Sequence, residues 1–251
     1  MLYERDYLLG LTEAEKQQYE EVTGRKFGEK RVSGFGRVNN FLAYPKAARM
    51  CKSLFPNNYL DVAELRDAER LAAANEEFFS LLSDEACTER SILNFIKDKK
   101  YYHIIGSIIW GLSINIGNHG VYLFPEFQLG NSYKADYLLM GKSSGGYEFI
   151  FIELESPYGN ITLKDGQLGA EFRDGISQLE DWKRWLPANY SSFGEVMRKH
   201  KNNALDLPEE FYVLDMSRFH YVVISGRRSD FQDKTYIIKR ERKKADDIDI
   251  I

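Results

Sequence analysis

The sequence predicts an α+β fold with a central mixed β-sheet flanked by helices. Three apolar, β-rich runs follow one another over residues 121–128, 136–140 and 147–154, with short connections between them. Such runs are typical of neighbouring strands, and we expect these three to form a meander. A helical pattern over residues 166–186 and a further apolar run over 219–225 add a helix and a strand to this core.

The length and composition of the chain set its organisation. The chain has 251 residues, of which 43% are hydrophobic and 14% aromatic, enough for one substantial core and a smaller accessory region. We expect residues 1–85 to form a helical N-terminal region that caps the main domain or supports oligomerisation. Residues 86–251 would then form the main domain.

The N-terminal region begins with a short helix. Thr12 and Glu15 have the spacing of a capping box, in which the two side chains accept hydrogen bonds from free amide groups. Residues 24–40 are rich in Gly and charge and are interpreted as a loop or irregular ribbon. Residues 61–82 carry apolar side chains at helical spacing and predict a second helix.

The C-terminal half supplies the remaining elements. The helix over 166–186 has an apolar stripe of helical period, and a shorter helix is expected over 193–200. Residues 219–225 and 235–240 are interpreted as strands. The chain ends at Ile251 inside a pattern that still alternates apolar and acidic residues, so we expect further chain to follow. The stripe consists of Leu168, Phe172, Ile176, Leu179, Trp182 and Leu186.

Acidic residues stand in or beside two of the apolar runs. Glu153 and Glu155 end the run over 147–154, and Asp136 opens the run before it. A buried carboxylate without a partner loses its charge, so several carboxylates meeting there suggest a bound cation. In a meander Asp136 and Glu153 can meet at one margin of the sheet. Hard oxygen ligands of this kind suit Mg²⁺ or Mn²⁺.

A purely structural alternative remains open for these acids. They can instead form salt bridges with basic residues of the helix that follows. Those residues are Arg173, Lys183 and Arg184.

From about Thr88 to Arg228, the order of the segments resembles the PD-(D/E)xK nuclease fold, and most closely the Shedu family of bacterial anti-phage defence proteins. Agreement in serial order is more specific than any single motif. The resemblance implies a restriction-endonuclease-like core for residues 86–251, Mg²⁺-dependent cleavage of DNA and a homo-oligomer. The matching segments are 89–96, 124–127, 134–139, 152–157, the helix with Gln178, and 221–228.

The resemblance makes Asp136 and Glu153 metal ligands and places Glu155 where the family pattern usually has Lys. That Lys orients the attacking water and stabilises negative charge on the phosphate, and a carboxylate cannot donate this positive charge. Some restriction endonucleases of the fold carry Glu at the position, where it acts on the water or joins the metal ligands. Catalysis would therefore use Glu155.

Three further residues are candidates for the site. Lys134 lies two residues before Asp136 and can substitute for the missing Lys; the alternative is a solvated loop residue. Glu126, near the predicted sheet edge, is a second candidate metal ligand, or else an ordinary outward-facing residue. Gln178 lies about 40° from Trp182 around its helix and can reach the same edge, or else faces solvent.

The charge of the chain does not itself indicate DNA binding. The net charge is −4, whereas neutralising phosphates requires local Lys and Arg. Several basic clusters exist, including residues 97–100, 198–201 and 239–244. Arg227 and Arg228 follow a predicted core strand and are the preferred candidates for contacts to DNA phosphates.

The sequence also bears on location. No apolar run is long enough to cross a bilayer, and charged residues interrupt the start of the chain where a signal peptide would lie. Cys51 and Cys87 have no CxxC or metal-ligand spacing, which favours free thiols in a reducing compartment. We expect a cytoplasmic protein with no membrane partner.

Three functions are compatible with these patterns. The preferred one is a metal-dependent DNA endonuclease of a phage-defence system. The second is a catalytically silent nucleic-acid-binding module of the same fold, which the loss of the motif Lys favours. The third is an interaction scaffold that binds neither DNA nor divalent cations.

Overall fold

The computed structural model of the chain describes residues 1–23, 51–60, 67–112, 114, 116, 120–159, 161–163 and 167–251. Three predicted features lie wholly or partly outside these ranges. The loop over 24–40 is one, and the others are the beginnings of the helices predicted over 61–82 and 166–186.

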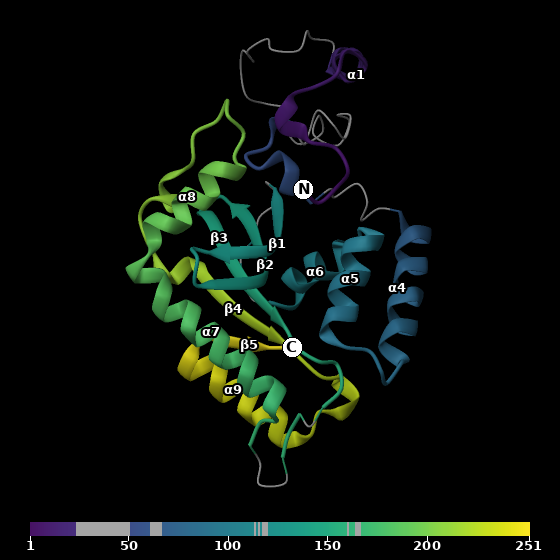
Figure 1. The fold of residues 1–251 in the computed structure, drawn as a ribbon, viewed down its shortest axis with the longest axis vertical. Coiled ribbons are helices and arrows are strands. Elements are labelled where there is room, and N and C mark those ends of the chain that lie inside the picture. Colours follow the sequence, from purple (N-terminus) through teal and green to yellow (C-terminus); the bar gives the residue numbers. More distant parts are fainter. Residues whose placement is uncertain are drawn as a thin grey trace.

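A five-stranded mixed sheet forms the centre of the molecule, with its strands in the order β1-β2-β3-β4-β5 (Figure 1). The first three strands are consecutive and antiparallel, whereas β4 and β5 each run parallel to their neighbour. The predicted meander is therefore confirmed, and so is the strand predicted over 219–225. The strands are β1 (Val121–Leu129), β2 (Tyr133–Ser143), β3 (Gly146–Leu154), β4 (Phe219–Ile224) and β5 (Ile248–Ile250).

Helices cover both faces of this sheet (Figure 1). On one face α7 (Ala170–Ala188) and α8 (Tyr190–His200) pack on Phe149 and Phe151 of β3. On the other face α5 (Glu89–Lys99) and α6 (His103–Gly106) contribute to a second core. An α+β fold with a mixed sheet flanked by helices is thus confirmed, and it is consistent with a restriction-endonuclease-like core.

Strand β3 is buried on both faces because both cores meet on it. Its even-numbered apolar residues, such as Ile150 and Ile152, belong to the core under α5, and Phe149 and Phe151 belong to the core under α7. A continuous apolar run is the expected sequence for such a strand. Glu153 near the end of β3 and Glu155 just beyond it are therefore carried by a strand whose position is fixed by packing on both faces.

One predicted strand is wrong. Residues 235–240 lie inside helix α9 (Asp233–Asp246) instead of a strand. The Thr235 hydroxyl accepts from the Gln232 backbone N–H, and the Thr235 backbone N–H donates to the Gln232 carbonyl, so a hydrogen-bonded cap begins the helix. The apolar run from Tyr236 to Ile238 is too short to distinguish the period of a strand from that of a helix. The cap before it and the charged residues after it favour the helix.

The N-terminal region packs on the same two cores as the rest of the chain. Leu2 and Leu60 belong to the core under α5, and Phe55 belongs to the core under α7. Helix α4 (Ala68–Ser83) packs outside α5, where Phe78 stacks on Phe95 at a centroid distance of 5.9 Å.

Short helical elements complete the chain. Helix α1 (Glu13–Thr23) begins with the predicted capping box, in which the Glu15 backbone N–H donates to the Thr12 hydroxyl and the Thr12 N–H donates to the Glu15 carboxylate. The 3-10 turns are η1 (Tyr7–Leu9), η2 (Pro56–Asn58), η4 (Ser107–Gly111), η5 (Glu209–Phe211), η6 (Met216–Arg218) and η7 (Arg228–Asp230).

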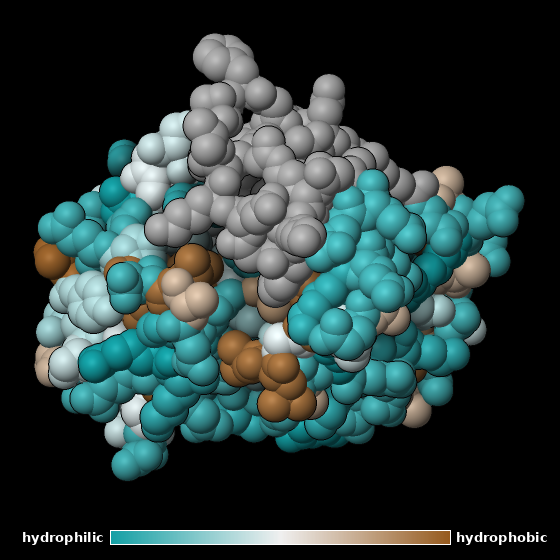
Figure 2. All heavy atoms as spheres, turned by 90° about the horizontal axis from the view of Figure 1, so that it is seen from above, coloured by the Kyte–Doolittle hydropathy of each residue, from teal (hydrophilic) through white to brown (hydrophobic). Residues whose placement is uncertain are grey.

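The surface carries few large apolar side chains. Figure 2 looks down on the molecule from above the view of Figure 1 and shows mainly hydrophilic residues, with apolar ones in separate spots. Trp110 and Leu9 are the most exposed of the large apolar side chains among the described residues. Within the described ranges, no helix has the length and apolar character needed to cross a membrane.

Candidate acidic site at the margin of the sheet

The predicted carboxylates occupy one row across the first three strands. Tyr137 pairs with Ile152, so the next position along each strand places Asp136 opposite Glu153. Pro125 and Phe127 pair with Tyr137 and Ala135, which places Glu126 opposite Asp136. The meander therefore brings the three acids to neighbouring positions, as its register requires.

Asp136 and Glu153 are held together at the seam between β2 and β3. Only 9% of Asp136 and 7% of Glu153 is exposed. The Leu154 backbone N–H donates to Asp136 Oδ2 over 2.8 Å. Among the described residues, the buried Oε2 of Glu153 has no hydrogen-bond partner. A buried polar atom without a partner costs roughly 1–3 kcal/mol, so a ligand that binds it would be stabilising.

Burial keeps both carboxyls from ionising easily. Burial raises the pKa of Asp136 to about 6, although the hydrogen bond from Leu154 opposes the shift. Burial and the nearby charges of Asp136 and Glu155 raise the pKa of Glu153 to about 9. Carboxyls gathered without a counter-charge shift in this direction, and a bound cation would reverse it.

Glu155 joins this pair from the residue just beyond β3. Its backbone N–H donates to the Ile224 carbonyl over 2.8 Å, which ties it to β4. Its side chain packs on Gly175 of α7, where a Cβ atom would lie 3.0 Å from Glu155 Oε1. Burial, followed by the charges of Glu89 and Asp174, raises the pKa of Glu155 to about 7.

Glu89 is a site residue that the sequence reasoning missed. It is the first residue of α5, after the Thr88 cap, and it is close enough to raise the pKa of Asp136, Glu153 and Glu155. Its only signal in the sequence was an acid at the start of a helix that precedes the acidic strands. That position is common, because acids stabilise helix N-termini.

Gln178 lies on the exposed surface of α7. It follows Asp174 by four residues and Gly175 by three, and therefore shares their stripe on the helix. Asp174 affects Glu155 electrostatically and Gly175 contacts it. The helix thus places Gln178 one turn beyond the acids, and no hydrogen bond joins its side chain to them in the described structure.

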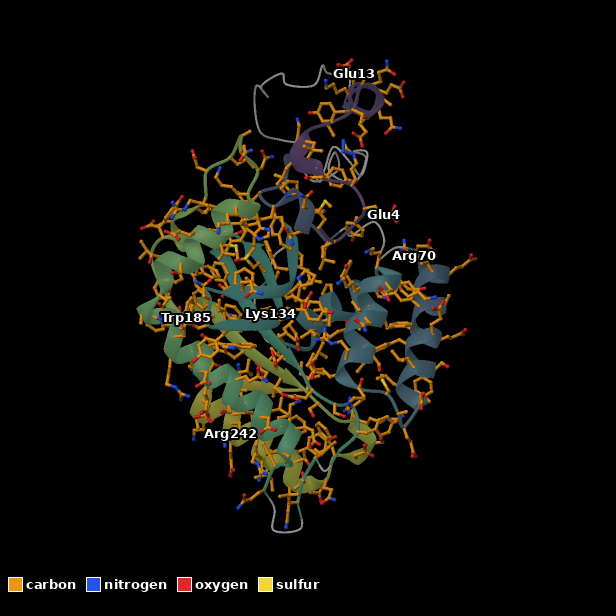
Figure 3. All side chains as sticks on the ribbon, in the orientation of Figure 1. Glu4, Glu13, Arg70, Lys134, Trp185 and Arg242 are labelled. Carbon is orange, nitrogen blue, oxygen red and sulfur yellow. The ribbon has the colours of Figure 1, made fainter. Side chains whose placement is uncertain are left out.

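Glu126 and Lys134 are paired with each other. Lys134 Nζ lies 2.7 Å from Glu126 Oε1, and both side chains are about half exposed. Glu126 has a φ of 50°, a left-handed conformation that non-glycine residues adopt infrequently. In Figure 3, Lys134 lies over the central strands, between Trp185 and the side of the molecule that carries α5.

Arg227 is anchored to the body of the protein. Its Nη1 donates to the Tyr158 hydroxyl over 2.9 Å, and its guanidinium lies 5.5 Å from the centre of the Tyr158 ring. The same hydroxyl donates to the Leu82 carbonyl of α4 over 2.7 Å. Arg228 begins η7 and is exposed, beside this anchor.

The donor set fits a divalent cation held by two protein carboxylates. Among the described residues, no three His, Cys, Asp or Glu side chains form a ready metal-ligand group. Mg²⁺, however, commonly binds through one or two carboxylates plus water and substrate phosphate. Asp136 and Glu153, with the unpartnered Oε2, meet that requirement.

Comparison with known proteins identifies the family of residues 86–251. Residues 86–251 match the family model described as Shedu protein SduA, C-terminal. This segment contains all five strands and every residue of the acidic site described above. No curated protein matches the chain.

Proposed function

Because the chain belongs to the Shedu SduA family through residues 86–251, and this family implies a context of phage defence, we propose that it is a metal-dependent DNA endonuclease. One observation carries the proposal. The buried Glu153 carboxyl has an unpartnered oxygen directly beside Asp136, in a site with raised carboxyl pKa values.

Asp136 and Glu153 would hold Mg²⁺ or Mn²⁺, and Glu126 can join them only after it leaves Lys134. A bound divalent cation supplies positive charge that polarises the scissile phosphate and acidifies water. The two ligands must be ionised to bind, so near neutral pH cation binding would chiefly displace the proton of Glu153, whose pKa is about 9. The Leu154 N–H would keep Asp136 in place during this change.

Glu155 would take the proton of the attacking water. Its pKa of about 7 suits a general base near neutral pH. The water oxygen would attack phosphorus in line, and the bond from phosphorus to the leaving oxygen would break. Gln178 would orient the water or the phosphate from the exposed stripe of α7.

Lys134 would supply the positive charge that the motif Lys normally gives. In the described structure its ammonium is paired with Glu126, so it must change partner to reach a phosphate. Arg228 would contact a backbone phosphate beyond the cleaved one. Arg227 would position it, since Arg227 itself is held on Tyr158.

Cleavage assays test the proposal directly. Supercoiled, linear and single-stranded DNA are incubated with the protein in Mg²⁺, Mn²⁺ or EDTA. Wild type should cleave only with the cation, and Asp136→Asn should lower the rate by about two to three orders of magnitude, the cost typical of losing one electrostatic stabiliser. Asp181→Asn is the matched control, because Asp181 lies on α7 in an ion pair with Arg184. Cleavage in EDTA, or an undiminished rate for Asp136→Asn, contradicts the proposal.

A silent DNA-binding module is the second candidate, and one observation favours it. The position of the motif Lys is occupied by Glu155, which is surrounded by other acids, and Lys134 is engaged elsewhere. This function predicts DNA binding that EDTA and Asp136→Asn leave unchanged, with no cleavage under any condition.

Two further properties are proposed. The family resemblance implies a homo-oligomer, and the sequence patterns at the start of the chain and around the cysteines predict a cytoplasmic location, where phage DNA would be encountered. Light scattering after size exclusion gives the mass of the particle, and a mass of one chain contradicts the first proposal. Fractionation of cells with a tagged chain tests the second.

A further inference from the structure

Helix α5 carries a polar stripe along its exposed side. Arg90, Asn94 and Lys97 are exposed and lie four and three residues apart, so they share one face of the helix. The opposite face packs into the core. The buried residues on it are Ile92, Leu93 and Ile96.

The two cations of the stripe are available for a ligand. Within the part of the chain that the structure describes, neither Arg90 nor Lys97 takes part in an ion pair or hydrogen bond. Lys99, two residues further along the same helix, is paired with Glu77 of α4 over 2.9 Å. Lys99 is therefore already neutralised by a protein carboxylate, whereas in the described structure the charges of Arg90 and Lys97 are not.

The stripe borders the acidic site. Arg90 follows Glu89, and its charge opposes the rise that burial causes in the pKa of Asp136. Arg90 and Lys97 both lower the pKa of Glu126, although its hydrogen bond with Lys134 is the larger cause. Arg90, Lys97 and Lys134 thus lie close to the carboxylates of the acidic site.

We propose that Arg90 and Lys97 bind backbone phosphates of DNA next to the acidic site. The substrate class rests on the proposed function, but the contacts do not depend on cleavage. Seven residues of helix span about 10.5 Å. One DNA strand rises about 3.4 Å along the helix axis per phosphate and also winds around that axis, so consecutive phosphates lie farther apart than this rise, and the two cations can contact phosphates one or two steps apart. They would also offset the repulsion between the acids and DNA.

Salt-dependent binding tests the proposal without any chemistry. A short fluorescein-labelled DNA duplex is titrated by fluorescence anisotropy in EDTA at several salt concentrations. The proteins compared are wild type, the double variant Arg90→Gln/Lys97→Gln, and the control Lys99→Gln, which removes a paired cation from the same helix. Circular dichroism checks that α5 is intact in each.

The double variant should bind more weakly and lose about 1.8 from the slope of log affinity against log salt, since two phosphate contacts contribute about 0.9 each. Lys99→Gln should keep the wild-type slope. An unchanged slope in the double variant overturns the proposal, as does the absence of salt-dependent binding by wild type. If wild type binds with the expected slopes but never cleaves, the nuclease proposal fails and this one stands.

Discussion

Asp136 accepts the backbone N–H of Leu154 over 2.8 Å, and Leu154 stands between Glu153 and Glu155 in the chain. This single bond fixes Asp136 relative to Glu153 at the end of β3 and to Glu155 just beyond it. It also stabilises the ionised form of Asp136, because a carboxylate accepts hydrogen bonds more strongly than a carboxylic acid. The site therefore combines rigid placement with carboxyls that resist ionisation.

The stability of the cation-free protein should fall as pH rises. Folding raises the pKa of Asp136 from 3.8 to about 6, of Glu155 from 4.5 to about 7 and of Glu153 from 4.5 to about 9. A raised pKa means that the folded state binds more protons, so this stability is complete below about pH 4 and is lost as pH passes the folded values. Urea denaturation in EDTA at pH 5 and pH 9 measures the loss.

Glu153→Gln should remove much of that dependence. The amide cannot ionise, whereas the wild-type carboxyl must bind a proton or carry a buried charge as pH rises, so at pH 9 the variant should exceed wild type by roughly 1–3 kcal/mol. Asp181→Asn is the control and should follow wild type. A wild-type stability that is constant from pH 5 to pH 9 contradicts the prediction.

Cleavage should depend on the ionisation of Glu155. If Glu155 is the general base, the rate rises with pH and levels off at or below about pH 7, because a bound cation lowers its pKa of about 7 further. Glu155→Gln should lower the rate by about 100-fold or more and remove this inflection. Single-turnover rates across pH provide the test, with Glu180→Gln as a control on α7. An unchanged inflection in Glu155→Gln assigns the proton transfer to another group.

Gly175 should tolerate no side chain. A Cβ atom there would lie 2.6 Å from Val223 Cγ2 and 3.0 Å from Glu155 Cγ, so Gly175→Ala must displace a buried strand residue or the proposed base. Overpacking typically costs about 1–3 kcal/mol, partly offset by about 1 kcal/mol of helix propensity. The free energy of unfolding, measured by urea denaturation, and the cleavage rate should both be lower than those of Gly111→Ala. At Gly111 nothing lies within 4 Å of an added Cβ atom. Equal results for the two variants would falsify the close contact.

Tyr158 should hold α4 against the body of the domain. Tyr158→Phe keeps the ring but loses the bonds to the Leu82 carbonyl and from Arg227. Two lost hydrogen bonds predict a destabilisation of roughly 1–3 kcal/mol. Hydrogen exchange should quicken first in α4, whereas the exposed control Tyr236→Phe should leave it unchanged. Wild-type protection of α4 in Tyr158→Phe would refute the role.

The sequence was most informative where the period of apolar residues matched one element. Strand β3 and the meander followed from continuous β-rich runs between short turns, and α7 followed from its apolar stripe. Helix α9 was missed because its few apolar residues are consecutive, which suits a strand equally well, and the cap at Gln232 was overlooked.

The side chains around the acids were harder to predict than the strands that carry them. The pairing of Asp136 with Glu153 follows from strand register, which the short turn between β2 and β3 fixes. The contribution of Glu89 depends on how α5 packs across the sheet, and no local pattern contains that information. The direction of Glu126 depends on a φ of 50°, which strand periodicity does not anticipate.

The consecutive order of β1, β2 and β3 has a consequence for how the site assembles. Asp136 and Leu154 are 18 residues apart, so one hairpin closure brings the carboxylates together. Short loops close rapidly and with little loss of chain entropy. We therefore expect the acids to meet early in folding, while water still surrounds them. Burial by the helices would follow, and this later step would make the carboxyls take up protons or a cation.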